Sequence, residues 1–163
     1  TEVQAAASRS TQPSAGVGLH EAAFVGDLQA LRQHIAAGAD LNARDPSGAS
    51  ALIIAATFGQ TEVARYLIAA GADVNQQNND GSTALLAAAL FCRTEIVEAL
   101  LANGADKQIR NNVGSTALEV VKGPFDEAKG IYDYLRTALQ PYGLELDYAR
   151  IEATRPRIAE MLR

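Results

Sequence analysis

The stretch AGADVNQQNNDGSTALLAAA, residues 70–89, recurs in altered form on both sides at a spacing of 33 residues. Its counterparts are AGADLNARDPSGASALIIAA at residues 37–56 and NGADKQIRNNVGSTALEVVK at residues 103–122. A leucine keeps the same spacing at positions 19, 52, 85 and 118. A fixed period of this length, kept by several residue types, indicates a repeat architecture. We therefore expect four units, at about residues 15–44, 45–77, 78–110 and 111–143.

Each unit predicts a tight turn followed by two short helices. In the second unit, DPSG at residues 45–48 has β-turn residues, and Ser50 can cap the first helix. Gly59 can end that helix in a left-handed conformation, and a second helix follows from Thr61 to Gly71. A helix pair this small must stack on its neighbours to bury its apolar face. The expected fold is an all-α solenoid of stacked helix pairs with β-hairpin-like loops.

The pattern resembles the ankyrin repeat over about four-fifths of the chain. The family's Thr-Pro-Leu-His motif reads SALI at residues 50–53, TALL at 83–86 and TALE at 116–119. These variants lack the Pro and the His, and only His20 keeps the His. The Gly-Ala-Asp-hydrophobic-Asn motif is present twice and drifts to GADKQ in the third copy. The Thr-Ala-Leu variant is more similar to bacterial ankyrin proteins than to animal ones.

The N-terminal end departs from the repeat. Residues 1–14 are rich in Ala, Ser, Thr and Gln without an apolar period, which is typical of a flexible tail. The chain has no starting Met, and such a start fits both a processed export signal and an arbitrary boundary. Localisation therefore leans slightly to an exported protein, with the cytoplasm as the alternative.

The C-terminal end also breaks the rhythm, at KGPF in residues 122–125. Asp126 can cap a helix whose apolar positions are Ile131, Tyr134, Leu135 and Leu139, and the C-terminal residues are expected to cover the first three. Residues 144–163 predict a helical C-terminal cap with a break at Pro156. In this cap Ile151, Ile158, Met161 and Leu162 should cover the last unit. The arginines Arg150, Arg155, Arg157 and Arg163 should face water.

Composition excludes several classes of function. The 163 residues carry a formal charge of −5, which argues against nucleic acid or an anionic membrane surface as the main partner. The longest apolar stretches, such as residues 84–92, are far too short to span a membrane. A single Cys permits no intrachain disulfide.

Few residues could carry chemistry. No Cys/His pair has metal-ligand spacing. The resemblance assigns His20 to stabilising a hairpin turn, and His34 falls near the end of a second helix, where it is expected to be partly buried or capping. Cys92 replaces Gly26 and Gly59 at the end of a first helix, so its backbone should be forced towards positive φ. We expect no enzyme, no cofactor and no metal site.

The resemblance implies that a partner protein binds the concave face, made of the hairpin tips and the exposed side of the first helices. By register, the tip residues are Pro46, Ser47, Ala49, Asn79, Asp80, Ser82, Asn112, Val113 and Ser115. The corresponding first-helix residues are Phe24, Val25, Thr57, Phe58, Leu90 and Phe91. Of these, Val25, Phe58 and Phe91 share one position. They form either an exposed apolar row for a partner or filling between the helices. The polar tips either contact the partner or serve only the turn geometry.

The predicted function is a non-enzymatic protein–protein interaction module, monomeric in isolation. One alternative is a regulatory or inhibitory subunit that docks on an enzyme. Another is a structural protein that associates with itself through the concave face.

Overall fold

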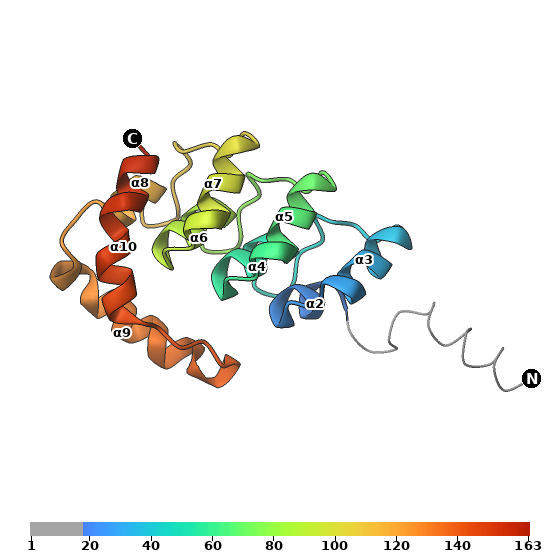
Figure 1. Ribbon diagram of the computed structural model, residues 1–163, viewed down its shortest axis with the longest axis horizontal. Coiled ribbons are helices and arrows are strands. Elements are labelled where there is room, and N and C mark those ends of the chain that lie inside the picture. The colour runs from blue at the N-terminus through green and yellow to red at the C-terminus, as the bar shows by residue number, and fades with distance from the viewer. Residues whose placement is uncertain (1–17) are drawn as a thin grey trace, which may run out of the picture.

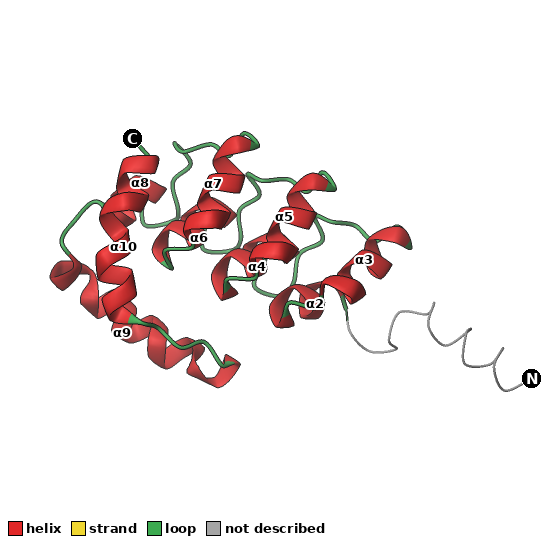
Figure 2. Ribbon diagram, viewed as in Figure 1, coloured by secondary structure: helices red, strands yellow, loops and turns green. Residues whose placement is uncertain are grey.

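The computed structural model describes residues 18–163, and these residues form helices joined by loops, with no strand among them (Figures 1 and 2). The first helices of the units are α2 (Leu19–Val25), α4 (Ala51–Phe58), α6 (Ala84–Leu90) and α8 (Ala117–Val121). The second helices are α3 (Leu28–Ala36), α5 (Thr61–Ala69) and α7 (Thr94–Ala102). Then come α9 (Phe125–Leu139), the 3-10 helix η1 (Gln140–Tyr142) and α10 (Tyr148–Met161). The expected tail at residues 1–14 lies outside the described residues.

The helices stack in two layers, which confirms the predicted all-α solenoid. The first helices α2, α4, α6 and α8 pack on one another in chain order, and each of α3, α5 and α7 packs on the first helix before it. Ala55 and Ala88 are fully buried and let neighbouring helices approach closely, while Leu52 and Leu85 fill the core beside them. Burying each leucine contributes about 1.5–3 kcal/mol, so the stacking itself stabilises the array.

The first helices begin and end as the repeat pattern predicts. The hydroxyls of Ser50 and Thr83 accept hydrogen bonds from backbone N–H groups one turn later. Gly59 ends α4 with a left-handed backbone. The predicted strain at Cys92 is confirmed, because its φ of 54° is the one positive value at a non-glycine residue in the described chain. Cys92 therefore adopts the left-handed backbone conformation that glycine adopts at the equivalent positions 26 and 59.

The hairpin loops are tied to one another by their tip asparagines. The backbone N–H of Asn79 donates to the Ser47 carbonyl at 3.0 Å, and its side-chain amide donates to the Pro46 carbonyl at 3.2 Å. Asn112 repeats both bonds one unit later, to Asp80 and Asn79. These tip asparagines therefore serve loop stacking. The His20 ring nitrogen similarly lies 2.8 Å from the Ala43 carbonyl, which fits the structural role expected of this histidine.

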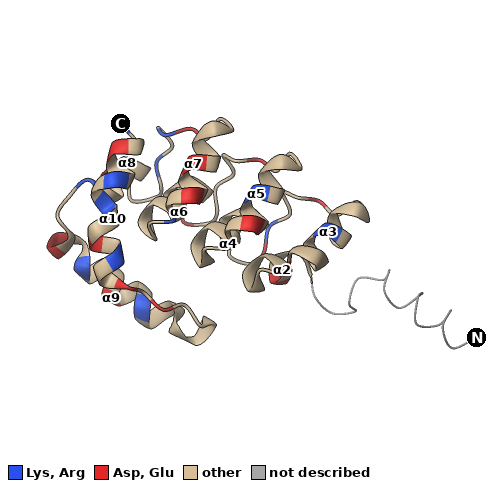
Figure 3. Ribbon diagram, in the orientation of Figure 1, with Lys and Arg blue, Asp and Glu red and all other residues tan. Residues whose placement is uncertain are grey.

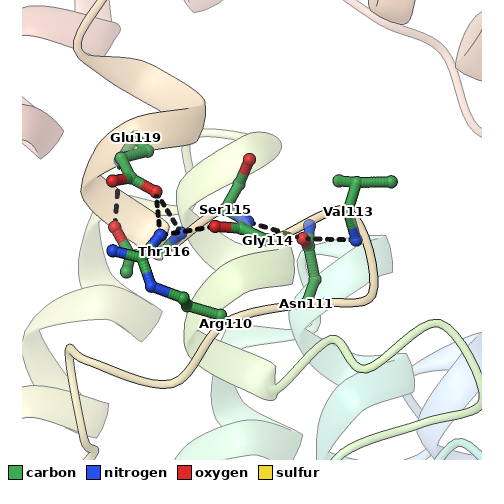
Figure 4. Close-up of polar contacts among 7 residues, drawn as sticks. All are labelled: Arg110, Asn111, Val113, Gly114, Ser115, Thr116 and Glu119. Carbon is green, nitrogen blue, oxygen red and sulfur yellow. Dashed lines mark hydrogen bonds and ion pairs between the residues drawn. The ribbon is translucent and has the colours of Figure 1, made fainter.

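The last described unit is built differently from the others. Helix α8 opens with the expected capping box between Thr116 and Glu119 (Figure 4). The helix that packs on α8 and α7 is α10, whereas α9 leaves the stack and extends past the ends of α6 and α4 (Figure 1). Residues 122–147, here called the arm, are thus placed between α8 and α10. The division into a fourth repeat at 111–143 and a cap at 144–163 stays a prediction, and the packing of α10 favours another boundary.

The structure corrects the expected burial on α9. Ile131 and Tyr134 are 56% and 71% exposed, and the fully buried side chain is that of Tyr132. The apolar residues of α9 surround much of its circumference, and the face bearing Tyr132 is the one turned to the solenoid.

On α10, Ile151, Ile158 and Leu162 are buried as predicted, but Arg155 is only 3% exposed and Arg150 is half-buried. Both arginines donate hydrogen bonds to carbonyl groups of the solenoid. Pro156 lies inside α10 without breaking it. The carbonyl that loses its helical donor belongs to Glu152, which is exposed, so water can replace the missing bond.

Candidate functional site

The C-terminal ends of the first helices form one edge of the array, and each is closed by a side chain from later in the sequence. The Gln60 amide donates to the Phe24 carbonyl at 2.9 Å, at the end of α2. Arg93 donates to the Thr57 carbonyl at 3.1 Å, at the end of α4. These donors replace the hydrogen bonds that the last carbonyls of a helix lack.

Two arginines of α10 continue this series of donors. Arg150 donates to the carbonyls of Phe91 and Cys92 at 3.0 and 2.9 Å, at the end of α6. Arg155 donates to the carbonyls of Val120 and Gly123, both at 3.1 Å, at the end of α8. Positive charge is favourable at a helix C-terminus, where the macrodipole is negative. Two of the four arginines that were expected to face water, Arg150 and Arg155, therefore hold the last two first helices.

Burial perturbs the titratable groups at this edge. Burial, with the nearby charge of Arg150, lowers the pKa of Arg93 to about 10. Burial raises the pKa of the Cys92 thiol, and it also raises the pKa of the Tyr132 phenol. A cysteine nucleophile needs a lowered pKa and access to substrate, and Cys92 has neither. This environment gives Cys92 a packing role.

The aromatic residues along the same edge do not form the exposed row that sequence register suggested. Phe91 is only 4% exposed, so it packs between elements, while Val25 is 57% exposed. Phe58 is half-buried, and its ring meets that of Phe24 edge-on at 4.6 Å. The Tyr142 ring of the arm approaches Phe24 at 6.4 Å. The three residues of the predicted row thus differ in burial, and the arm contacts Phe24, the neighbour of Val25.

A hollow of about 130 Å³ lies between three first helices and the loops that precede two of them. Its apolar wall comes from α4, α6 and α8, and its polar rim comes from the loops. It is lined by Ile53, Thr57, Leu86, Ala87, Leu90, Phe91 and Val120, together with Asn78, Ser82 and Asn111. Four of the predicted site residues, Thr57, Ser82, Leu90 and Phe91, thus meet at one place.

Sequence reasoning missed the wall residues Ile53 and Leu86. They are spaced by 33 residues, at the position of the family's motif histidine, so register could have identified them. It also missed the rim asparagines Asn78 and Asn111, whose side-chain oxygens accept backbone N–H bonds from their own loops. The hollow is therefore built on preformed turns.

The predicted tip residues fall into two groups. Ala49 is buried, and Ser82 and Ser115 are half-buried, so these three are set back from the tips. The exposed tip residues are Pro46, Ser47, Asn79, Asp80, Asn112 and Val113. Val113, at the end of the loop stack, is the most exposed large apolar side chain of the described residues. This second group is accessible to a partner, although Asn79 and Asn112 also form the hydrogen bonds that tie the loops together.

Charged groups lie around the hollow rather than in it. Acidic and basic residues lie along the loops and the second helices (Figure 3). At one border, Arg110 forms an ion pair with Glu119 at 2.8 Å and also donates to the Gly114 carbonyl (Figure 4). The backbone N–H of Thr116 and the Arg110 guanidinium lower the pKa of Glu119. Across residues 18–163, no cluster of three or more His, Cys, Asp or Glu side chains could hold a metal ion.

Comparison with known proteins agrees with this architecture. The family model for ankyrin repeats in three copies matches residues 19–111, more than half of the 163-residue chain. The chain therefore belongs to the ankyrin repeat family. No curated protein matches the chain significantly. None of the helices described here is long and apolar enough to cross a membrane.

Proposed function

We propose that this ankyrin protein binds another protein on its concave face and that the hollow receives one apolar side chain of the partner. Ankyrin repeats are generally protein–protein interaction modules and are typically not enzymes. The observation that carries the proposal is the hollow itself, with an apolar wall and a polar rim of Asn78, Ser82 and Asn111. An apolar centre within a polar rim is the usual anatomy of a protein interface.

The size of the hollow supports a protein partner over a small ligand. Pockets for drug-sized molecules have volumes of roughly 300–1,000 Å³. A hollow of about 130 Å³ accommodates a single aliphatic or aromatic side chain. The exposed tips at Asn79, Asp80 and Val113 would contact the chain on either side of that anchor. We also propose that the protein is of the bacterial ankyrin type, that it contains a fourth repeat and that it is monomeric in isolation.

The test fills the hollow without removing a core side chain. Ala87 lines it, and Ala87→Met adds bulk there; Ala102→Met, on the exposed end of α7, is the matched control. The partner is first identified by a photo-crosslinking residue at Thr57, and its affinity is then measured by calorimetry. We expect Ala87→Met to weaken binding at least tenfold, about 1.4 kcal/mol, and Ala102→Met to leave it unchanged. Equal affinities of both variants would show that the partner binds elsewhere.

The two alternative functions give different results in the same experiments. An inhibitory subunit would bring down an enzyme whose activity falls stoichiometrically on binding. A self-associating protein would crosslink to its own chain, and its mass in light scattering would rise with concentration.

A further inference from the structure

The arm is an addition to the regular unit. Its helix α9 has 15 residues, whereas each of the second helices α3, α5 and α7 has nine. In repeat proteins, extra segments gather on one face, which is often the binding face. Three of the five exposed large apolar side chains of the described residues lie on the arm: Ile131, Tyr134 and Tyr142.

The two halves of the arm are held very unequally. In the proximal half, the buried Tyr132 donates to the Leu90 carbonyl at 2.7 Å and accepts from Arg155 at 2.9 Å. Phe125 stacks on the same ring with centroids 5.7 Å apart, and Asp133 accepts a 2.7 Å bond from the Tyr148 hydroxyl. These contacts fix the root of the arm to the stack and to α10.

The distal half, residues 135–143, is attached more weakly to the first helices, and its own anchors are Arg136, over the Tyr148 ring at 5.2 Å, and the buried Leu144 that follows it. Leu135 and Leu139 are only half-buried, and Tyr142 is 61% exposed. Its ring contact with Phe24 is edge-on, with the centroids 6.4 Å apart. Few contacts of this kind, together with high exposure, characterise a segment that opens locally at low cost.

The distal half ends on the surface next to the proposed binding site. Phe24 contacts both Tyr142 and Phe58, and Phe58 directly follows Thr57, which lines the hollow. At the other side, the Leu90 carbonyl binds Tyr132 while Leu90 also lines the hollow. The arm therefore spans the helix ends beside the hollow from α6 to α2.

We propose that residues 135–143 act as an autoinhibitory strap on the Phe24–Phe58 surface, which a partner displaces as it binds. This inference rests on the proposed function, since it assigns a regulator to the same face. Only molecules with an open strap can bind the partner. The apparent affinity for the partner is therefore the intrinsic affinity multiplied by the open fraction. Release of the strap exposes the Phe24 and Phe58 rings for the partner and leaves the root of the arm at Tyr132 in place.

The closed and open states can be measured in the 163-residue chain before any partner is known. Tyr142→Ala removes the ring that contacts Phe24, and Tyr134→Ala removes an equally large exposed tyrosine from helix α9 of the same arm. Hydrogen exchange follows the amides of residues 135–143, and the dye anilinonaphthalene sulfonate probes uncovered apolar surface. We expect Tyr142→Ala to speed exchange at least fivefold and to increase dye fluorescence at least twofold. Tyr134→Ala should change neither.

A tryptophan reporter gives an independent readout, because the chain contains no Trp. In the Tyr142→Trp variant, the single indole replaces the ring at Phe24. Adding Phe58→Ala should then make its emission more accessible to the quencher acrylamide. Unchanged exchange and dye binding in Tyr142→Ala, or unchanged quenching here, would overturn the strap.

The affinity for the partner distinguishes a displaceable strap from a fixed part of the binding site. With the crosslinked partner, Tyr142→Ala should tighten Kd about three- to tenfold. Weaker or unchanged binding would mean that the arm is a fixed part of the site and would overturn the inference. The Ala87→Met test of the hollow stands apart, because it reports whether the partner uses the concave face whatever the strap does.

Discussion

The phenol of Tyr132, on α9, donates a 2.7 Å hydrogen bond to the carbonyl of Leu90, 42 residues earlier at the end of α6. The same oxygen accepts a 2.9 Å bond from Arg155 on α10. One side chain thus joins the arm, the stack and the last helix at a point that is closed to water.

Tyr132→Phe keeps the ring and removes both hydrogen bonds. We expect the free energy of unfolding in urea to fall by about 1–2 kcal/mol, because a buried carbonyl loses its donor. Tyr134→Phe is the matched control, since the Tyr134 side chain is largely exposed. Equal midpoints for the two variants would show that the Tyr132 hydroxyl does not hold the arm.

Arg155→Met should be more damaging. The substitution keeps much of the buried volume but leaves the carbonyls of Val120 and Gly123 without their donor. A loss of about 2–4 kcal/mol in unfolding free energy is expected from two partly buried acceptors left unsatisfied. Arg157→Met, two residues along and exposed, should cost under about 1 kcal/mol. If thermal melting cannot separate the two variants, Arg155 is no more important than a surface charge.

Cys92 allows a test of backbone strain. Cys92→Gly relieves a left-handed conformation but loses a packed side chain, so its stability should stay within about 1 kcal/mol of the parent. Cys92→Ala loses the sulfur and keeps the strain, so it should be less stable than Cys92→Gly by about 1 kcal/mol. Chemical denaturation of both variants gives the order. The reverse order would mean that the strain is negligible.

The capping box on α8 should make stability depend on pH in the acid range. The Thr116 N–H and the Arg110 guanidinium hold the pKa of Glu119 below its ordinary value of 4.5. Because the pKa is lower in the folded state, this stabilisation is present above pH 4.5 and is lost as the pH falls through the lowered value. Glu119→Gln should therefore flatten the fall in stability between about pH 5 and pH 2. Glu152→Gln, on the exposed side of α10, should leave the profile unchanged.

The repeated part of the molecule could be predicted because equivalent positions recur every 33 residues. Leu52 and Leu85 occupy one core position, and Gly59 and Cys92 occupy one helix-end position, so a reading from one unit transfers to the next. Register likewise named four of the ten residues that line the hollow, namely Thr57, Ser82, Leu90 and Phe91. Thr57 and Leu90 were found by register, whereas Ile53 and Leu86 share a register position that was considered only for its missing histidine.

The arm could not be predicted in this way, because its sequence has no second copy. Because residues 131, 132, 134 and 135 of α9 are all apolar or aromatic, the sequence permits more than one buried face. The hydrogen bond from the Tyr132 hydroxyl to the Leu90 carbonyl favours the face that bears Tyr132. The burial of Arg155 depends on two carbonyls 32 and 35 residues earlier in the chain. A long-range arrangement of this kind leaves no local signal in the sequence, and arginine is ordinarily an exposed residue.

The side chains that donate to the last carbonyls of the first helices all come from later in the sequence than the helices themselves. Gln60 completes α2, Arg93 completes α4, and Arg150 and Arg155 complete α6 and α8. Every donor lies downstream of the helix that it completes, so during synthesis each first helix stays unfinished until the following segment has left the ribosome. Shortening the chain from its beginning removes no donor that the remaining helices need. Shortening it from its end leaves a helix with bare carbonyls each time, so the last sixteen residues, 148–163, complete two helices that come well before them.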